Sequence, residues 1–191
     1  MDIDSACHAS RVERYLARLD ELFGGVEPTF HEWPSTHAGQ KGITAIVYRD
    51  LPEPGFITGL TYGLSLAEHP AWRFGKPELT ISVRSSDINW VLAIASFAEE
   101  WRGEQPFVYG STMNHGEPIA AESKMSAFVV FAPAVFAKED SAIDVGDPTK
   151  INLYGCYPIY ESERSFTVQN GLEAFWKLDW DPYNVHRAPA V

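Results

Sequence analysis

The chain is poor in cysteine and in basic residues. Its 191 residues include two cysteines, and 15 lysines and arginines stand against 26 aspartates and glutamates, for a formal net charge of −11. Cys7 and Cys156 lie far apart in the sequence and match neither a disulfide framework nor a metal-ligand spacing. The shortage of cationic side chains disfavours nucleic acid and anionic membranes as partners, because their phosphates require lysine and arginine.

Long apolar runs are missing as well. No stretch approaches the roughly 20 residues that cross a membrane as a helix. The first residues, Met1 to Asp4, are acidic where a signal peptide would be basic. We therefore expect a cytoplasmic protein in a reducing compartment.

Signatures of catalytic, phosphate-binding and metal sites are also absent. The segment from Gly110 to Asn114 lacks the glycine that follows the serine of a nucleophile elbow by two residues. No glycine-rich run follows a predicted strand as in a phosphate-binding loop. His31 and His37 are six residues apart across Pro34, whereas a helical zinc motif needs histidines four apart. We therefore predict no enzyme activity, no cofactor and no metal.

One tripeptide leaves an enzymatic alternative open. Glu122 and Lys124 fall within a predicted strand, Ala121 to Phe131, where residues two apart lie on the same face. A carboxylate and a lysine on one strand face occur in metal-dependent nucleases, although for so short a motif an exposed ion pair is the more common explanation. The alternative function is a metal-dependent hydrolase or nuclease centred on Glu122 and Lys124.

Apolar periodicity predicts three helical segments. Residues at helical spacing predict an amphipathic helix from about Ser5 to Phe23. A second, largely buried helix is expected from Asp87 to Trp101. A third is expected from Ser162 to Leu178, with Ser162 as its N-cap and a break at Asn170-Gly171.

Alternating apolar residues predict strands between these helices. The expected strands cover residues 29–33, 43–48, 56–66, 78–84, 107–109, 121–131 and 151–160. Because Pro158 cannot donate to a ladder, it must lie on an edge strand or at a strand end. The order of elements favours an α+β fold with a mainly antiparallel (mixed) sheet packed by helices. We expect a single domain over residues 1–191, with a core from about 30 to 180 and an extended C-terminal tail.

Five segments follow one another in an order that is known from one protein family. They are Tyr62–Leu66, Pro77–Ile81, Trp90–Trp101, Gly110–Ile119 with the apolar strand after it, and Tyr157–Glu163. They resemble the G-L-S strand, the E-L-T strand, the central helix, the approach to the following strand and the PI-x-x-x-E signature of the suppressor of fused family. The resemblance spans roughly residues 30 to 180. It implies a bacterial single-domain member, because the chain has no room for the second domain of the animal members.

The resemblance implies a non-enzymatic protein-binding domain. Animal members bind and restrain a transcription factor, and bacterial members of similar length are often proposed as immunity proteins that neutralise toxins. Together with the acidic net charge of the chain, the resemblance suggests a basic protein partner that is neutralised by steric occlusion. A regulator that sequesters a transcription factor is a further alternative, and the oligomeric state stays open.

Acidic and aromatic residues interleave near the C-terminus and form the candidate binding surface. The candidate residues are Glu161, Glu163, Glu173, Asp179, Trp180, Asp181 and Tyr183, with Trp176 among them. Aromatic side chains flanked by charge are typical of binding hot spots, and carboxylates select basic partners. Alternatively, Trp176 and Trp180 clamp the final segment onto the protein. Trp72 and Phe74 form a smaller candidate patch.

Overall fold

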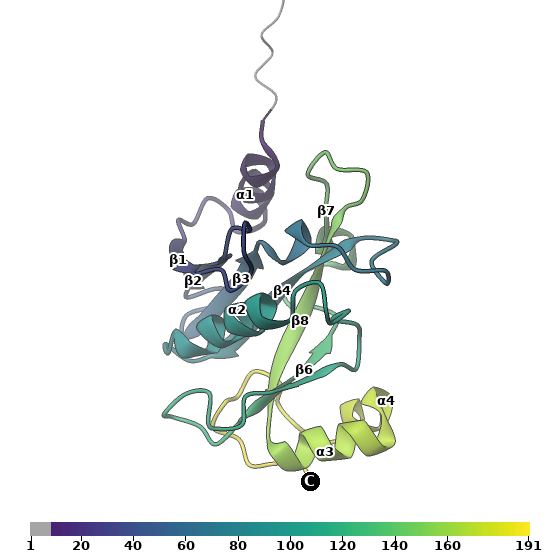
Figure 1. Ribbon diagram of the computed structural model, residues 1–191. Coiled ribbons are helices and arrows are strands. Elements are labelled where there is room, and N and C mark those ends of the chain that lie inside the picture. The colour runs from purple at the N-terminus through teal and green to yellow at the C-terminus, as the bar shows by residue number, and fades with distance from the viewer. Residues whose placement is uncertain (1–8) are drawn as a thin grey trace, which may run out of the picture.

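The computed structural model describes residues 9–191 (Figure 1). Its α-helices are α1 (Arg11–Leu22), α2 (Asn89–Trp101), α3 (Glu161–Asn170) and α4 (Leu172–Trp176), and its short 3-10 helices are η1 (Leu64–Leu66) and η2 (Lys138–Ser141). Its strands are β1 (Thr29–Trp33), β2 (Ile43–Arg49), β3 (Phe56–Tyr62), β4 (Lys76–Arg84), β5 (Thr112–Asn114), β6 (Ala127–Phe131), β7 (Ala142–Ile143) and β8 (Ile151–Ile159).

All eight strands belong to one mixed sheet. Seven of them follow the order β1-β2-β3-β4-β8-β6-β5, and β7 pairs with the start of β8. Neighbouring strands run antiparallel except β4 and β8, which run parallel. The predicted α+β fold with a mainly antiparallel, mixed sheet is confirmed.

Side-chain alternation along the strands divides the core between the two faces of the sheet. Ile43 and Val47 of β2 belong to the cluster under α2, whereas Ile46 and Tyr48 belong to the cluster under α1. A third cluster joins β6 and β8 to Phe175 of α4. Figure 1 shows α2 lying across the sheet, with α1 towards one end and α3 and α4 towards the other.

Helix α2 packs closely on β3 at Gly59. A Cβ atom at this position would lie 2.2 Å from Cγ1 of Val91, so only a glycine allows the helix to come so near. Trp90, Val91 and Ile94 are completely buried. The predicted burial of this helix, which rested on its few polar residues, is confirmed.

Helix α1 begins later than apolar spacing predicts. The helix was expected to start near Ser5, but Ala9 and Ser10 are not helical and α1 begins at Arg11. Residues 5–8 lie outside the described residues. Ser10 caps the helix: its hydroxyl accepts a hydrogen bond from the Glu13 N–H, and the Glu13 carboxylate accepts one from the Ser10 N–H at 2.6 Å. This capping box is a sequence signal, and it places the start correctly.

Three strand predictions need correction, two of them in part and one altogether. The strand that begins at Phe56 ends at Tyr62, because Gly63 adopts a φ of 127° and η1 follows. Residues 107–109 form no strand, since Phe107 has a positive φ of 49°. Residues 121–126 precede β6 as a turn and an irregular segment, and the pairing strand β5 lies where none was predicted.

The last part of the chain follows the prediction more closely. Pro158 lies one residue before the end of β8, in the half of the strand that no longer pairs with β4. The N-cap of α3 is Tyr160 rather than Ser162, and Gly171, with a φ of 85°, separates α3 from α4 as predicted. Residues 177–191 contain no helix or strand.

Candidate protein-binding surface

The residues of the predicted surface fall into three groups with different surroundings. Glu161 and Glu163 lie at the start of α3, and Glu173, Asp179 and Trp180 lie in and after α4. Asp181 and Tyr183 lie beside the end of β4, where Arg84 donates its N–H to the Tyr183 carbonyl at 2.8 Å. The predicted surface is therefore divided between α3, the region of α4 and the end of β4.

Glu163 is not a surface residue. Its side chain is completely buried and pairs with Arg187, whose Nη2 lies 2.8 Å from Oε2. Its carboxylate also accepts hydrogen bonds from the N–H groups of Tyr160 and Ala190, each at 2.8 Å. Glu163 therefore fastens the C-terminal tail to α3, and its assignment to a binding surface is corrected.

Three other candidate carboxylates form exposed ion pairs within the chain. Glu161 pairs with Arg164 at 2.7 Å, Glu173 with Lys177 at 2.6 Å and Asp181 with Arg84 at 2.6 Å. Exposed pairs of this kind contribute about 0–1 kcal/mol each, so a cationic partner can replace the internal cation at little cost. Asp179 is exposed and takes part in no ion pair within residues 9–191.

The aromatic residues near α4 form a continuous strip, here called the α4 strip. It consists of Tyr109, Phe131, Trp176 and Trp180. Successive ring centroids lie 5.2 Å, 4.5 Å and 5.3 Å apart. All four rings keep some exposure, and Tyr109 is 53% exposed. Rings that their neighbours already hold in place lose little conformational freedom when a partner binds.

Part of the α4 strip also serves as the predicted clamp. The guanidinium of Arg187 lies 4.8 Å from the centre of the Trp180 ring, and Trp180 packs on Phe175 of α4 at 4.7 Å. Trp180 therefore helps to hold the tail while one part of its surface stays open. Sequence reasoning missed Tyr109 and Phe131, because no local spacing connects them with α4.

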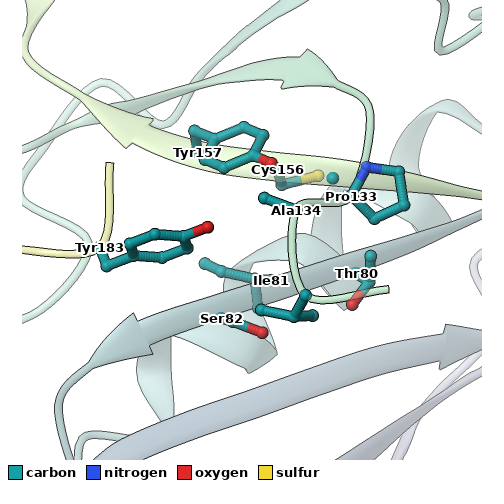
Figure 2. A pocket seen from close by; sticks show the side chains of 10 residues that line it. Thr80, Ile81, Ser82, Pro133, Ala134, Cys156, Tyr157 and Tyr183 are labelled. Atoms are coloured by element: carbon teal, nitrogen blue, oxygen red, sulfur yellow. The ribbon is translucent and has the colours of Figure 1, made fainter. Parts of the chain in front are cut away.

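Tyr183 packs inward at the place where β4 and β8 separate. Its ring lies 5.8 Å from that of Phe56. Figure 2 shows it beside Ile81 of β4 and Tyr157 of β8, around a cavity of about 10 Å³. A cavity of this size holds about one water molecule, so this part of the tail fills a gap in the sheet and leaves no room for a ligand.

The smaller candidate patch is divided by burial. Trp72 is 7% exposed, and its indole N–H donates to the Pro106 carbonyl at 2.9 Å. Phe74, two residues later, is 95% exposed. The loop before β4 therefore offers a single exposed ring, and Trp72 belongs to the core.

Glu122 and Lys124 do not share a strand face. Glu122 lies in a turn, and its carboxylate accepts hydrogen bonds from the Trp90 indole at 2.9 Å and from the Ser85 hydroxyl. His186 of the tail lies 3.6 Å from the same carboxylate. Glu122 therefore connects the turn, the start of α2 and the tail. Within residues 9–191, no group of three or more His, Cys, Asp or Glu side chains is placed to hold a metal ion.

Two of the sequence blocks that carry the family resemblance meet in a buried network. Glu78 is completely buried and accepts hydrogen bonds from the N–H groups of Gly63 and Ser65, at 2.9 and 3.0 Å, and from the hydroxyls of Thr61 and Ser65. Burial raises the pKa of Glu78, and these hydrogen bonds offset part of that rise. The G-L-S and E-L-T blocks therefore stabilise the fold, as Glu163 of the PI-x-x-x-E block does.

A groove of about 880 Å³ opens between the start of α1 and the end of β1. Its walls come from four segments and include Val12, Trp33, Lys41, Tyr62 and Leu66. Because these residues are distant in sequence, no motif predicts the groove. The part of the chain that the structure describes contains no helix with the length and apolar character needed to span a membrane.

Comparisons with known proteins agree on one family. A family model described as suppressor of fused protein (SUFU) matches residues 39–188. No curated protein sequence matches the chain.

Solved structures show the same fold. A suppressor of fused homologue from Neisseria gonorrhoeae FA 1090 is similar with a TM-score of 0.74 and 18% identity, over 93% of this chain and 95% of the homologue. A chain of the Sufu–Fu complex is similar with a TM-score of 0.71 and 10% identity, over 95% and 92% of the two chains. Drosophila Suppressor of Fused is similar with a TM-score of 0.71 and 11% identity, over 99% of this chain but 54% of the Drosophila chain. This chain thus spans about half of the Drosophila protein.

Proposed function

The chain belongs to the suppressor of fused family, and on this basis we propose that it is a non-enzymatic protein-binding domain whose partner is a basic protein. The finer proposal is immunity: the domain covers the working surface of a basic toxin and blocks it sterically. This chain shares its fold with a chain of the Sufu–Fu complex, in which a family member is bound to another protein.

The observation that carries this proposal is the α4 strip with its flanking carboxylates. Tyr109 supplies an exposed ring at one end, and Trp176 and Trp180 supply partly exposed rings at the other. Glu173 precedes Trp176 by three residues in the same helix, and Asp179 adjoins Trp180. Aromatic anchors with nearby carboxylates suit a surface rich in lysine and arginine, through charge pairing and cation–π contact.

The net charge acts at an earlier step of binding. A formal charge of −11 attracts a basic partner over distances of about the 8–10 Å screening length at moderate ionic strength. The encounter is therefore accelerated before any side chain makes contact. Once the partner has docked, the packed rings of the α4 strip slow its release, because the dissociation rate follows the buried anchors.

The test begins by identifying a partner with the tagged full chain and measuring its affinity with purified components. We expect the double variant Tyr109→Ser/Asp179→Lys to weaken that affinity at least tenfold, because it removes the exposed ring and reverses the unpaired carboxylate. The matched control is Phe74→Ser/Glu53→Lys, which changes an exposed ring and an exposed acid elsewhere and should change affinity less than twofold. Equal affinities of both double variants would remove the α4 strip from consideration. Asp181 is a poorer choice, since its reversal also breaks the pair with Arg84.

A second measurement separates immunity from regulation. If the domain is an immunity protein, one equivalent of it should abolish the activity of a toxic partner, and Tyr109→Ser/Asp179→Lys should restore that activity. A transcription factor as the captured partner, released from its DNA when the domain is added, would support sequestration and contradict immunity. The genes next to the coding sequence give an independent indication, because a toxin gene is expected there only for immunity.

A further inference from the structure

We propose that the free edge of β1 is a second protein-binding site, which takes an extended cationic segment of another protein as an additional strand. The site lies at the opposite end of the strand order from the pair β6 and β5, and it shares no residue with the α4 strip. It therefore extends the proposed function and can be tested independently of it.

The backbone of β1 is open on one side. Within residues 9–191, β1 pairs only with β2, through the register Thr29–Val47 to Trp33–Ile43. Thr29, Phe30 and Glu32 are exposed, so no loop or helix covers these three side chains. In such a strand every second N–H and C=O group faces outward without a ladder partner, which is what an added strand requires.

The charge of residues 19–40, which include β1, has one sign; the cations that flank them in the sequence are Arg18 and Lys41, and Lys41 lines the groove beyond the end of β1. Residues 19–40 contain four carboxylates and neither lysine nor arginine: Asp20, Glu21, Glu27 and Glu32. Glu21 pairs with Arg18 at 2.7 Å, whereas the other three form no ion pair within residues 9–191. These free carboxylates match a segment that carries lysine or arginine. They disfavour a second copy of this chain, because like charges across paired strands are destabilising.

Apolar groups accompany the charge. Phe30 is 53% exposed on β1 itself, and Val26, just before the strand, is 40% exposed. The groove of about 880 Å³ begins where β1 ends and is lined by Trp33 and Leu66, the latter 45% exposed. In strand addition the main-chain bonds supply affinity and side-chain pockets supply specificity. The segment should therefore alternate apolar residues with lysine or arginine.

The experiment uses the full chain and a fluorescent nine-residue peptide in which valine and lysine alternate. Two related probes are a valine–glutamate peptide and a valine–lysine peptide with alternate amides N-methylated. We expect the parent peptide to bind at low salt and each related probe to bind at least tenfold more weakly, because one reverses the charge and the other blocks the ladder. Amide hydrogen exchange of β1 should slow at least tenfold at alternate positions when the parent peptide is present.

Protein variants locate the peptide. Glu27→Lys/Glu32→Lys should weaken peptide binding about tenfold, since each exposed charge contributes a factor of about two to five. The control Glu117→Lys/Glu173→Lys makes the same change in net charge after β5 and in α4, towards the other end of the strand order, and should weaken binding less than threefold. Tyr109→Ser/Asp179→Lys should leave peptide binding unchanged, so failure of the α4 strip and failure of the β1 edge are distinguishable.

Three results would overturn the proposal. The first is equal affinity for the N-methylated and parent peptides. The second is peptide binding without slower exchange in β1. The third is a dimer in which β1 amides are already protected in the absence of peptide, because a second copy would then occupy the edge.

Discussion

At the scale of single residues, three glutamates within residues 9–191 are buried, and their charges are compensated in different ways. Glu163 and Glu99 each pair with an arginine, Arg187 and Arg102, whereas the contacts of Glu78 come from hydroxyl and N–H donors. A buried carboxylate without such partners would cost several kcal/mol. Glu163 and Glu78 therefore hold together segments that are separate in the sequence, and Glu99 does so through the hydrogen bond that it accepts from the Thr36 N–H at 2.6 Å.

The pair between Glu163 and Arg187 should be among the most sensitive points of the fold. We expect Arg187→Met to lower the free energy of unfolding by about 3–5 kcal/mol, because it leaves the Glu163 charge buried without its cation. Arg164→Met removes the partner of exposed Glu161 and should cost at most about 1 kcal/mol. Urea denaturation of both variants measures the difference. Similar losses would show that burial does not decide the strength of these two pairs.

The burial of Glu78 leads us to expect an unusual dependence of the free energy of unfolding on pH. Its pKa is raised above the ordinary value of 4.5 by burial. Glu78 therefore holds its proton more tightly in the folded protein than in the unfolded protein. The contribution of Glu78 to stability is then full below pH 4.5 and declines as the pH rises through the raised pKa.

The test compares the wild type with Glu78→Gln by urea denaturation between pH 4 and pH 8. We expect the stability of the wild type relative to the variant to fall as the pH rises and then to level off. Glu13 and Glu161 have lowered pKa values and act in the opposite direction. They are present in both proteins and so cancel in the difference. A difference that grows with pH would contradict the raised pKa.

At the scale of secondary structure elements, the contact between α2 and β3 depends on one missing side chain. We expect Gly59→Ala to destabilise the protein by about 1–3 kcal/mol, because the new Cβ overlaps Val91 in a packed core. In the double variant Gly59→Ala/Val91→Ala the two shortest contacts, to the Cγ atoms of Val91, are removed and only the one to its Cβ, at 2.8 Å, remains, so the loss should be smaller than the sum of the two single losses. Thermal or urea unfolding of the four proteins of this cycle measures the coupling. Additive losses would mean that the helix moves away without strain.

The element boundaries show which sequence signals are reliable. Periodicity located the bodies of α2, β2 and β8, because it reports which residues face the core. The start of α1 was misplaced, since it depends on the cap formed by Ser10 and Glu13. At the start of α3 the Glu163 carboxylate likewise accepts a hydrogen bond from the N–H of the N-cap residue, Tyr160. Residues 121–126 were included in a strand although four of them are polar; they begin with a turn, and the strand starts only where the apolar run begins, at Ala127.

At the scale of the whole molecule, the C-terminal tail joins several distant parts of the fold. Tyr183 bonds to β4, His186 approaches Glu122, and Arg187 pairs with α3. Val185 is 1% exposed and belongs to the core cluster under α2. The tail is therefore an integral part of the domain.

Removal of residues 184–191 should leave the chain largely unfolded. The truncation removes the buried contacts of Val185, worth about 1.5–3 kcal/mol. It also leaves Glu163 without its arginine, at a cost of about 3–5 kcal/mol. Their sum is comparable with the total stability of a typical domain, about 5–15 kcal/mol. Circular dichroism and the cooperativity of thermal unfolding would measure the loss. A truncated protein with a normal cooperative transition would show that the tail is dispensable.

The amino-acid sequence alone determined the α+β fold, the mixed sheet, the helical segments and the family, because these depend on local periodicity and on short ordered blocks. Tertiary structure alone decided which acidic residues remain free. Glu163 is neutralised by an arginine 24 residues away, and the rings of the α4 strip come from positions as distant as Tyr109 and Trp180. The open edge of β1 likewise exists only because β2 pairs with one side of it. The physical reason is that spacing along the chain encodes which face of an element is apolar, whereas ion pairs, ring contacts and strand order arise between segments that meet only after folding.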